Sequence, residues 1–217
     1  MTEARRQLID TACRTAAAAL NKGAAGNLSV RHSESGRPGF LITPTGMPYA
    51  ALEPEDIVFM GLDGAASGRR KPSSEWRFHR DIYVARPGAE AILHAHSPFA
   101  VSLSCLRRDI PAFHYMIARF GGATIRCAAY ATFGTQALSD AALAAMDQRS
   151  ACLLANHGML VFGRSLEQAL DLGIELEELC EQYWRACCIG NPVLLSDAEM
   201  ALALDKFAAY GQQETTP

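Results

Sequence analysis

The chain has 217 residues, of which 49% are hydrophobic, so it is long and apolar enough for one globular domain with a full core. A formal net charge of −3 argues against nucleic acid or an anionic membrane as partner, and no apolar run approaches the ~20 residues that span a bilayer. Seven cysteines without a framework spacing, behind an N-terminus that lacks a secretory core, predict reduced thiols in the cytoplasm. We expect residues 1–217 to form a single domain, with 211–217 as a flexible C-terminal tail.

Hydrophobic periodicity divides the chain into helices and strands. Apolar residues at helical spacing predict helices over residues 4–22, 72–86, 99–106, 139–148, 166–188 and 197–210. Apolar or alternating runs between turn residues predict strands over residues 28–31, 39–43, 56–60, 89–97, 124–132, 151–155 and 159–162. The strands outnumber the helices that could cross over between them, and several adjoin by short turns. This pattern favours an α/β fold with a mixed or mostly antiparallel central sheet flanked by helices.

Two histidines end the expected strand 89–97. Because strand side chains alternate between faces, His94 and His96 point the same way, about 6 to 7 Å apart, and can share one tetrahedral metal ion. His157, at the end of another apolar strand, is the natural third imidazole, and three nitrogens with one open position are typical of catalytic zinc. Glu75, at a helix start, is a candidate fourth group, as a ligand or as a base that swings away from the metal. Each residue alone also suits an ordinary strand end or helix start.

Three short loops are rich in backbone N–H groups and hydroxyls, which are donors for a phosphate. They contain Gly26, Asn27, Ser29, Thr45, Gly46, Ser73 and Ser74. The last two open a helix, where free N–H groups and a partial positive charge favour an anion. Ordinary turn and capping chemistry is the alternative for each loop.

Three further residues could belong to the site. Tyr115 has a hydroxyl that can donate a proton to a developing alkoxide, although most tyrosines only pack and hydrogen-bond. His79 follows Glu75 by one helical turn and is expected either behind the metal ligands or at the surface. His32 lies in a polar hairpin, where we expect it to be solvated.

Seven segments carry a resemblance to a known family. They are residues 26–31, 42–46, 72–79, 94–96, 114–118, 130–135 and 157–158. They follow in the family order over nearly the whole chain, and together they are far more specific than any one alone. The sequence resembles the class II, zinc-dependent sugar-phosphate aldolases of the aldolase/adducin superfamily, and among them the L-fuculose-1-phosphate aldolases.

The resemblance implies a three-layer α/β fold, a fourfold symmetric homotetramer with the active site between subunits, and one zinc ion per subunit. It implies that His94, His96 and His157 hold the zinc, with Glu75 as resting ligand and catalytic base. The residues implied to hold the phosphate are Asn27, Thr45, Gly46, Ser73 and Ser74. Tyr115 would donate the proton to the aldehyde oxygen, and Tyr210 matches a tyrosine that reaches the site of a neighbouring subunit.

The activity implied is the reversible cleavage of a ketose 1-phosphate, such as L-fuculose 1-phosphate, into dihydroxyacetone phosphate and an aldehyde. Residues 126–129 depart from the family pattern, and the bulky Phe99 and Arg119 lie in segments expected near the aldehyde. A 5-deoxypentulose or 5-methylthioribulose 1-phosphate is therefore a second possible substrate. The resemblance also allows a pentulose-phosphate 4-epimerase, a zinc dehydratase or a non-catalytic interaction module like the adducin head.

Overall fold

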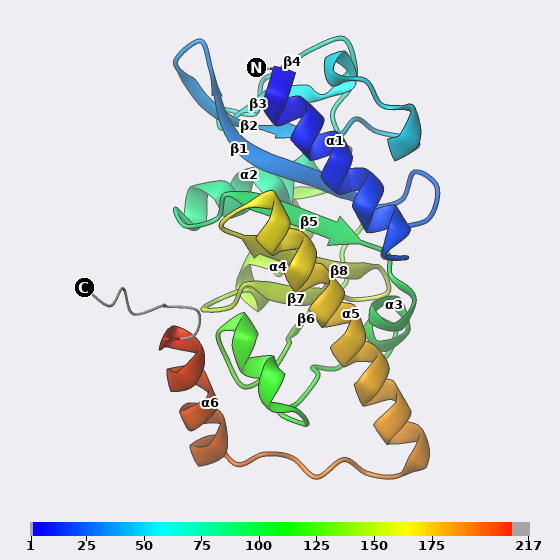
Figure 1. The fold of residues 1–217 in the computed structure, drawn as a ribbon, viewed down its shortest axis with the longest axis vertical. Coiled ribbons are helices and arrows are strands. Elements are labelled where there is room, and N and C mark those ends of the chain that lie inside the picture. Colours follow the sequence, from blue (N-terminus) through cyan, green and yellow to red (C-terminus); the bar gives the residue numbers. More distant parts are fainter. Residues whose placement is uncertain (1, 210–217) are drawn as a thin grey trace, which may run out of the picture.

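A central β-sheet organises the computed structural model, which describes residues 2–209 (Figure 1). Within that range the sheet has eight strands in the order β4-β3-β2-β1-β5-β8-β7-β6. The strands are β1 (Asn27–Glu34), β2 (Arg37–Ile42), β3 (Val58–Gly61), β4 (Ala66–Ser67), β5 (Ala91–Ala95), β6 (Cys127–Ala128), β7 (Ala151–Leu154) and β8 (Gly158–Gly163). Neighbouring strands are antiparallel except β6 and β7, which are parallel. The predicted mixed, mostly antiparallel sheet is confirmed.

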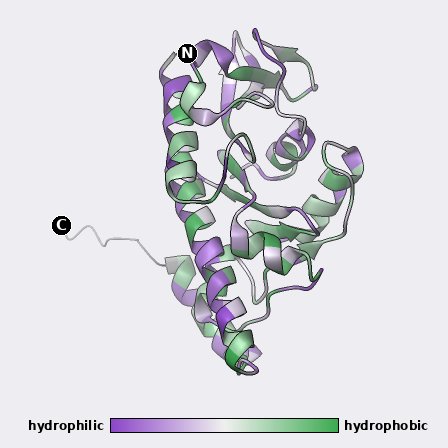
Figure 2. Ribbon diagram, turned by 90° about the vertical axis from the view of Figure 1, so that its right-hand side faces the viewer, coloured by the Kyte–Doolittle hydropathy of each residue, from purple (hydrophilic) through white to green (hydrophobic). Residues whose placement is uncertain are grey.

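Helices cover both faces of this sheet and complete the predicted three layers. They are α1 (Thr2–Ala17), α2 (Trp76–Ala85), α3 (Pro98–Ser104), α4 (Gln136–Ala145), α5 (Leu166–Ile189) and α6 (Asp197–Ala209). Short 3₁₀ helices lie at Tyr49–Ala51, Pro54–Asp56 and Tyr115–Phe120. In Figure 1, α1 and α5 cross in front of the sheet. Hydrophilic and hydrophobic residues alternate along the helices (Figure 2), as amphipathic elements with one buried face require.

Strand β5 separates two hydrophobic cores. Leu93 belongs to the core under α1, α3 and α5, whereas Ile92 belongs to the core under α2 and α4. Side chains on a strand alternate between faces, so His94 shares the α2 face with Ile92. No helix within residues 2–209 is both long and apolar enough to cross a membrane.

The structure moves several expected element boundaries: the helix expected over residues 4–22 ends at Ala17, and three other shifts have a visible cause. The helix expected from residue 72 begins at Trp76, because the preceding segment pairs with residues 43–45 through Ser73 N–H to Thr43 O and Thr45 N–H to Lys71 O. The helix expected from residue 139 begins at Gln136, because the Thr135 hydroxyl caps it by accepting from Leu138 N–H. Of the strand expected at 124–132, only Cys127–Ala128 pairs with β7, because the chain then leaves the sheet edge.

Two further histidine expectations are settled by burial. The expectation that His32 is solvated holds only in part, because the residue is half-buried in β1 with its ring edge against Phe59. Its Nε2 is buried without a hydrogen-bond partner among residues 2–209, and burial lowers its pKa. His79 is completely buried on α2, which excludes the surface alternative and leaves it behind the residues predicted to hold the metal.

Candidate metal centre and active site

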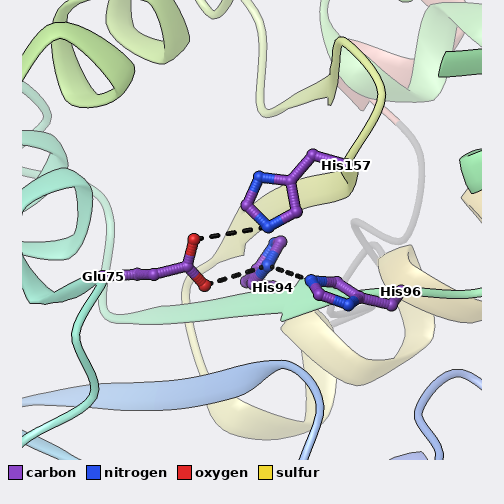
Figure 3. A group of neighbouring side chains, drawn as sticks. All are labelled: Glu75, His94, His96 and His157. Atoms are coloured by element: carbon purple, nitrogen blue, oxygen red, sulfur yellow. Dashed lines mark hydrogen bonds and ion pairs between the residues drawn. The ribbon is translucent and has the colours of Figure 1, made fainter. Parts of the chain in front are cut away.

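Three imidazoles and one carboxylate converge at the end of β5 (Figure 3). The Nε2 atoms of His94 and His96 are 2.9 Å apart. Glu75 reaches His94 Nε2 with Oε2 at 3.2 Å and His157 Nε2 with Oε1 at 3.3 Å. One potential ligand atom from each of the four residues lies within 4.8 Å of the others. The cluster that strand alternation predicted for His94 and His96 therefore exists, and it includes both residues proposed to complete it.

The sheet order explains why residues so distant in sequence meet here. Strand β5 lies between β1 and β8, so the turn before β8 carries His157 alongside the end of β5. Gly158 makes this approach possible, because a Cβ at that position would collide with the carbonyl oxygen of Ala95. Asn156 takes up a left-handed conformation (φ 54°) just before it. Glu75 arrives from the other direction, immediately before α2.

Hydrogen bonds orient the ring of His94 and hold the backbone around His96. His94 Nδ1 donates to the carbonyl oxygen of Met159 at 2.9 Å, which leaves Nε2 as the ligand atom. The backbone N–H of His96 donates to Asn21 Oδ1 at 3.0 Å, which holds the residue that follows the strand. The turn after His96 is held by Glu177 on α5, whose carboxylate accepts from the Ser97 hydroxyl and from the N–H groups of Phe99 and Ala100.

The electrostatics of the cluster suit a divalent cation. Burial, together with the smaller effect of the neighbouring His94, lowers the pKa of both His96 and His157 to about 4, so both imidazoles are neutral near pH 7. Burial alone would raise the pKa of Glu75, but His94, His157 and Asn27 lower it to about 2. Burial alone would lower the pKa of His94, but the Glu75 carboxylate raises it, so a positive charge is favoured at this position.

One atom tests whether a metal fits. Glu75 is only 7% exposed, and its Oε1 has no hydrogen-bond partner among the residues that the structure describes. A buried carboxylate oxygen without a donor is costly unless a cation satisfies it. Three imidazole nitrogens and one carboxylate oxygen are a donor set that zinc favours, with the cation taking the place of the positive charge favoured at His94. The residues present therefore fit a metal ion.

A cavity of about 340 Å³ opens above this cluster. Its lining includes Glu75, His96 and His157 together with the predicted phosphate-binding residues Asn27, Thr45, Gly46, Ser73 and Ser74. The pairing of residues 43–45 with 71–73 brings two of the three predicted loops side by side. A third side of the cavity is formed by Tyr130, Ala131 and Phe133.

Comparison with known proteins decides the family. The sequence profile described as "Class II Aldolase and Adducin N-terminal domain" matches residues 6–184. The chain belongs to this family. The predicted family and enzyme class, a lyase of the class II aldolase type, are thereby confirmed.

Several relatives of this class II aldolase align over almost their whole length. The 5-methylthioribulose-1-phosphate/5-deoxyribulose-1-phosphate aldolase of Rhodospirillum rubrum is 54% identical over 213 residues, which cover 98% of this chain and 95% of the relative. The L-fuculose phosphate aldolase of Escherichia coli is 46% identical over 207 residues, which cover 95% of this chain and 94% of the relative. A solved structure of an L-fuculose 1-phosphate aldolase superposes with a TM-score of 0.90 at 40% identity. The superposition covers 96% of this chain and 97% of the solved chain.

Of the two predicted tyrosines of the class II aldolase, one is not at this cavity. Tyr115 is 54% exposed and lines a separate cavity beside α6, with Met116, Arg119, Leu202, Ala203, Lys206 and Phe207. Tyr210 lies outside the described residues. The lining of the cavity described here therefore does not include Tyr115.

Sequence analysis missed several residues that support the site. Asn21 and Glu177 brace the turn around His96 from elements far away in the chain. Tyr130 and Phe133 lie in a segment that carried the family resemblance but had no role assigned to it. No local pattern marks Asn21 or Glu177, since each looks like an ordinary polar residue of a loop or a helix.

Proposed function

We propose that this class II aldolase binds zinc through His94, His96 and His157 and reversibly cleaves a ketose 1-phosphate into dihydroxyacetone phosphate and an aldehyde. The observation that carries the proposal is the convergence of three imidazoles and a buried carboxylate in a cavity that is also lined by predicted phosphate-binding loops. Zinc at these ligands would act as a Lewis acid and stabilise the negative charge that develops on the three-carbon fragment.

The protein groups would handle the protons and the orientation. Asn27, Thr45, Gly46, Ser73 and Ser74 would hold the phosphate, so that the carbon chain lies across the cavity. When the carbon–carbon bond breaks, its electron pair stays with the three-carbon fragment, and Glu75, which must first take up a proton from solvent, delivers that proton to the carbon. In the direction of synthesis Glu75 removes the same proton.

In the direction of synthesis the Tyr115 hydroxyl would donate its proton to the aldehyde oxygen. In the direction of cleavage Tyr115 would first lose its proton to solvent and then accept the proton of the hydroxyl that becomes the aldehyde carbonyl. Because Tyr115 lines a separate cavity of its own chain, we propose that it serves the site of a neighbouring copy in a homotetramer. Tyr210 is proposed to reach across in the same way.

The aldehyde end is the part of the substrate on which the candidates differ. Tyr130, Ala131 and Phe133 line the cavity, and the two aromatic side chains are more than half exposed. Such a wall suits an apolar terminal group, and the Rhodospirillum rubrum relative is named for 5-methylthio- and 5-deoxyribulose 1-phosphates. We therefore propose these as substrates, with L-fuculose 1-phosphate as the second candidate because of the E. coli relative.

The test measures the release of dihydroxyacetone phosphate from the three ketose 1-phosphates. We expect kcat/KM for the apolar-ended substrates to exceed that for L-fuculose 1-phosphate by about tenfold or more, since one methylene in an apolar pocket changes selectivity by about 1–3 kcal/mol. A reversed order would favour the second candidate. Conversion to a stereoisomer without release would instead identify an epimerase.

Removal of the metal tests the zinc requirement. We expect a chelator to abolish cleavage and added Zn²⁺ to restore it, with one zinc per chain by elemental analysis, because the zinc ion that the three histidines would hold is the only Lewis acid in the proposed reaction. Undiminished activity of the stripped protein would refute the proposal.

A further inference from the structure

A row of buried polar side chains leads from Glu75 into the interior between the sheet and α2. Asn27 Nδ2 lies 3.0 Å from Glu75 Oε2, and Asn27 Oδ1 lies 2.5 Å from His79 Nε2. The Ser29 hydroxyl lies 2.7 Å from His79 Nδ1 and 2.8 Å from the Tyr83 hydroxyl. None of these five residues is more than 7% exposed.

The ionised carboxylate sets the direction of every hydrogen bond in this row. A carboxylate only accepts, so Asn27 must turn its NH₂ group to Glu75 and its oxygen to His79. His79 Nε2 must then carry a proton, which leaves Nδ1 as an acceptor for the Ser29 hydroxyl. Ser29 has no second proton to give, so the Tyr83 hydroxyl donates to Ser29. Each group has a single orientation that satisfies its neighbours.

We propose that His79 is a positioning residue, which orients the Asn27 amide so that Asn27 holds one oxygen of the catalytic carboxylate of Glu75. Oε2 is tied to Asn27, while Oε1 has no hydrogen-bond partner among the described residues and faces His157. The row thus leaves one oxygen of Glu75 for metal or substrate. The geometric claim stands by itself, and only its kinetic consequence rests on the proposed function.

The surroundings of His79 are rigid enough for this role. Its ring stacks against Phe78 and Phe40, with centroids 4.8 and 6.4 Å away. Burial lowers its pKa to about 3, so the ring remains neutral and keeps one donor and one acceptor. Were Nε2 unable to donate, the Asn27 amide could rotate and bring its oxygen against the carboxylate, where two acceptors repel each other.

Two substitutions at His79 separate positioning from packing. His79→Phe keeps an aromatic ring but cannot donate to Asn27. His79→Gln loses the ring, yet its NH₂ group is as many bonds from the backbone as Nε2 and can donate to Asn27. Tyr83→Phe is the matched control, because it removes another buried polar group of α2 while the bonds from Ser29 to Glu75 remain.

We expect His79→Phe to lower kcat about tenfold or more with little change in KM, as loss of an outer partner of a metal-site residue typically does. His79→Gln should retain most of kcat, and Tyr83→Phe should lower the thermal midpoint more than kcat. Crystal structures of the metal-free variants should show a rotated Asn27 amide and a displaced Glu75 in His79→Phe only.

The outcomes distinguish this inference from the proposed function. Equal losses of kcat in His79→Phe and His79→Gln, or an unmoved Glu75 in His79→Phe, would overturn the positioning role. If the unmodified enzyme releases no dihydroxyacetone phosphate from any ketose 1-phosphate, the proposed function fails. The crystal structures still decide the role of His79 in that case.

Discussion

At the scale of single residues, Glu75 carries the most chemistry. It is buried, its pKa is lowered to about 2, and one of its oxygens is held by Asn27 while the other has no hydrogen-bond partner among residues 2–209. An ionised carboxylate with one free oxygen can serve as a metal ligand and as a proton acceptor. Both roles need the same atom to be accessible from the cavity, and Glu75 lines that cavity.

Replacement of Glu75 tests whether it is the base. We expect Glu75→Gln to bind zinc through the three remaining imidazoles but to lower kcat at least about a hundredfold, the low end for loss of a general base. Elemental analysis measures the metal and a coupled assay measures kcat. Near-normal turnover with zinc bound would show that another group moves the proton.

At the scale of elements, the start of α3 depends on a carboxylate from α5. Glu177 accepts three hydrogen bonds, at 2.6 Å from the Ser97 hydroxyl, 2.8 Å from Phe99 N–H and 2.9 Å from Ala100 N–H. The Ser97 side chain itself makes no capping bond to α3. A long-range contact therefore takes the place of the local cap found in most helices, and it lies one residue after His96.

Glu177→Gln should weaken this junction. Glutamine has one acceptor oxygen, so its NH₂ group must face a backbone N–H, and a buried donor loses its partner. We expect the free energy of unfolding of the metal-free protein to fall by about 1–3 kcal/mol in urea titrations. Glu178→Gln is the control on the same helix, since Glu178 is exposed. This change should alter the free energy of unfolding by less than about 0.5 kcal/mol. Equal effects of the two changes would contradict the bracing role.

At the scale of the whole molecule, the two proposed proton-transfer residues lie in different cavities. Glu75 lines the cavity above the metal ligands, and Tyr115 lines the one beside α6, with its ring stacked on Phe207 at 6.3 Å. A chain that acts alone would lack the second residue at its site. A closed assembly can supply it, because symmetry presents the same surface of every copy to a neighbour.

Mixed assemblies test this sharing of sites. Glu75→Gln and Tyr115→Phe chains should each be nearly inactive alone, yet coexpression of the two should restore activity. Random mixing pairs an intact Glu75 with an intact Tyr115 at about a quarter of the sites, so we expect up to about a quarter of normal kcat. Light scattering measures the size of the assembly. Failure of the mixture to gain activity, in an assembly that contains both chains, would place Tyr115 outside the neighbouring site.

Local sequence patterns determined the elements and most of the metal centre. Period-two alternation put His94 and His96 on one face of β5, and this depends only on the backbone geometry of a strand. Apolar runs bounded by turn residues predicted most of the strands, because short apolar segments of this kind are buried in a sheet. That residues 1–217 form one domain stays a prediction.

Only the tertiary structure decided which distant side chains touch. The order of the strands places Asn27 opposite His94. The packing of α2 against the sheet brings His79 behind Asn27 and buries a histidine whose sequence neighbours also allowed a surface position. It also left Tyr115 at a separate cavity. Contacts of this kind depend on strand order and helix packing, which are set by the burial of the whole chain and not by any short stretch of it.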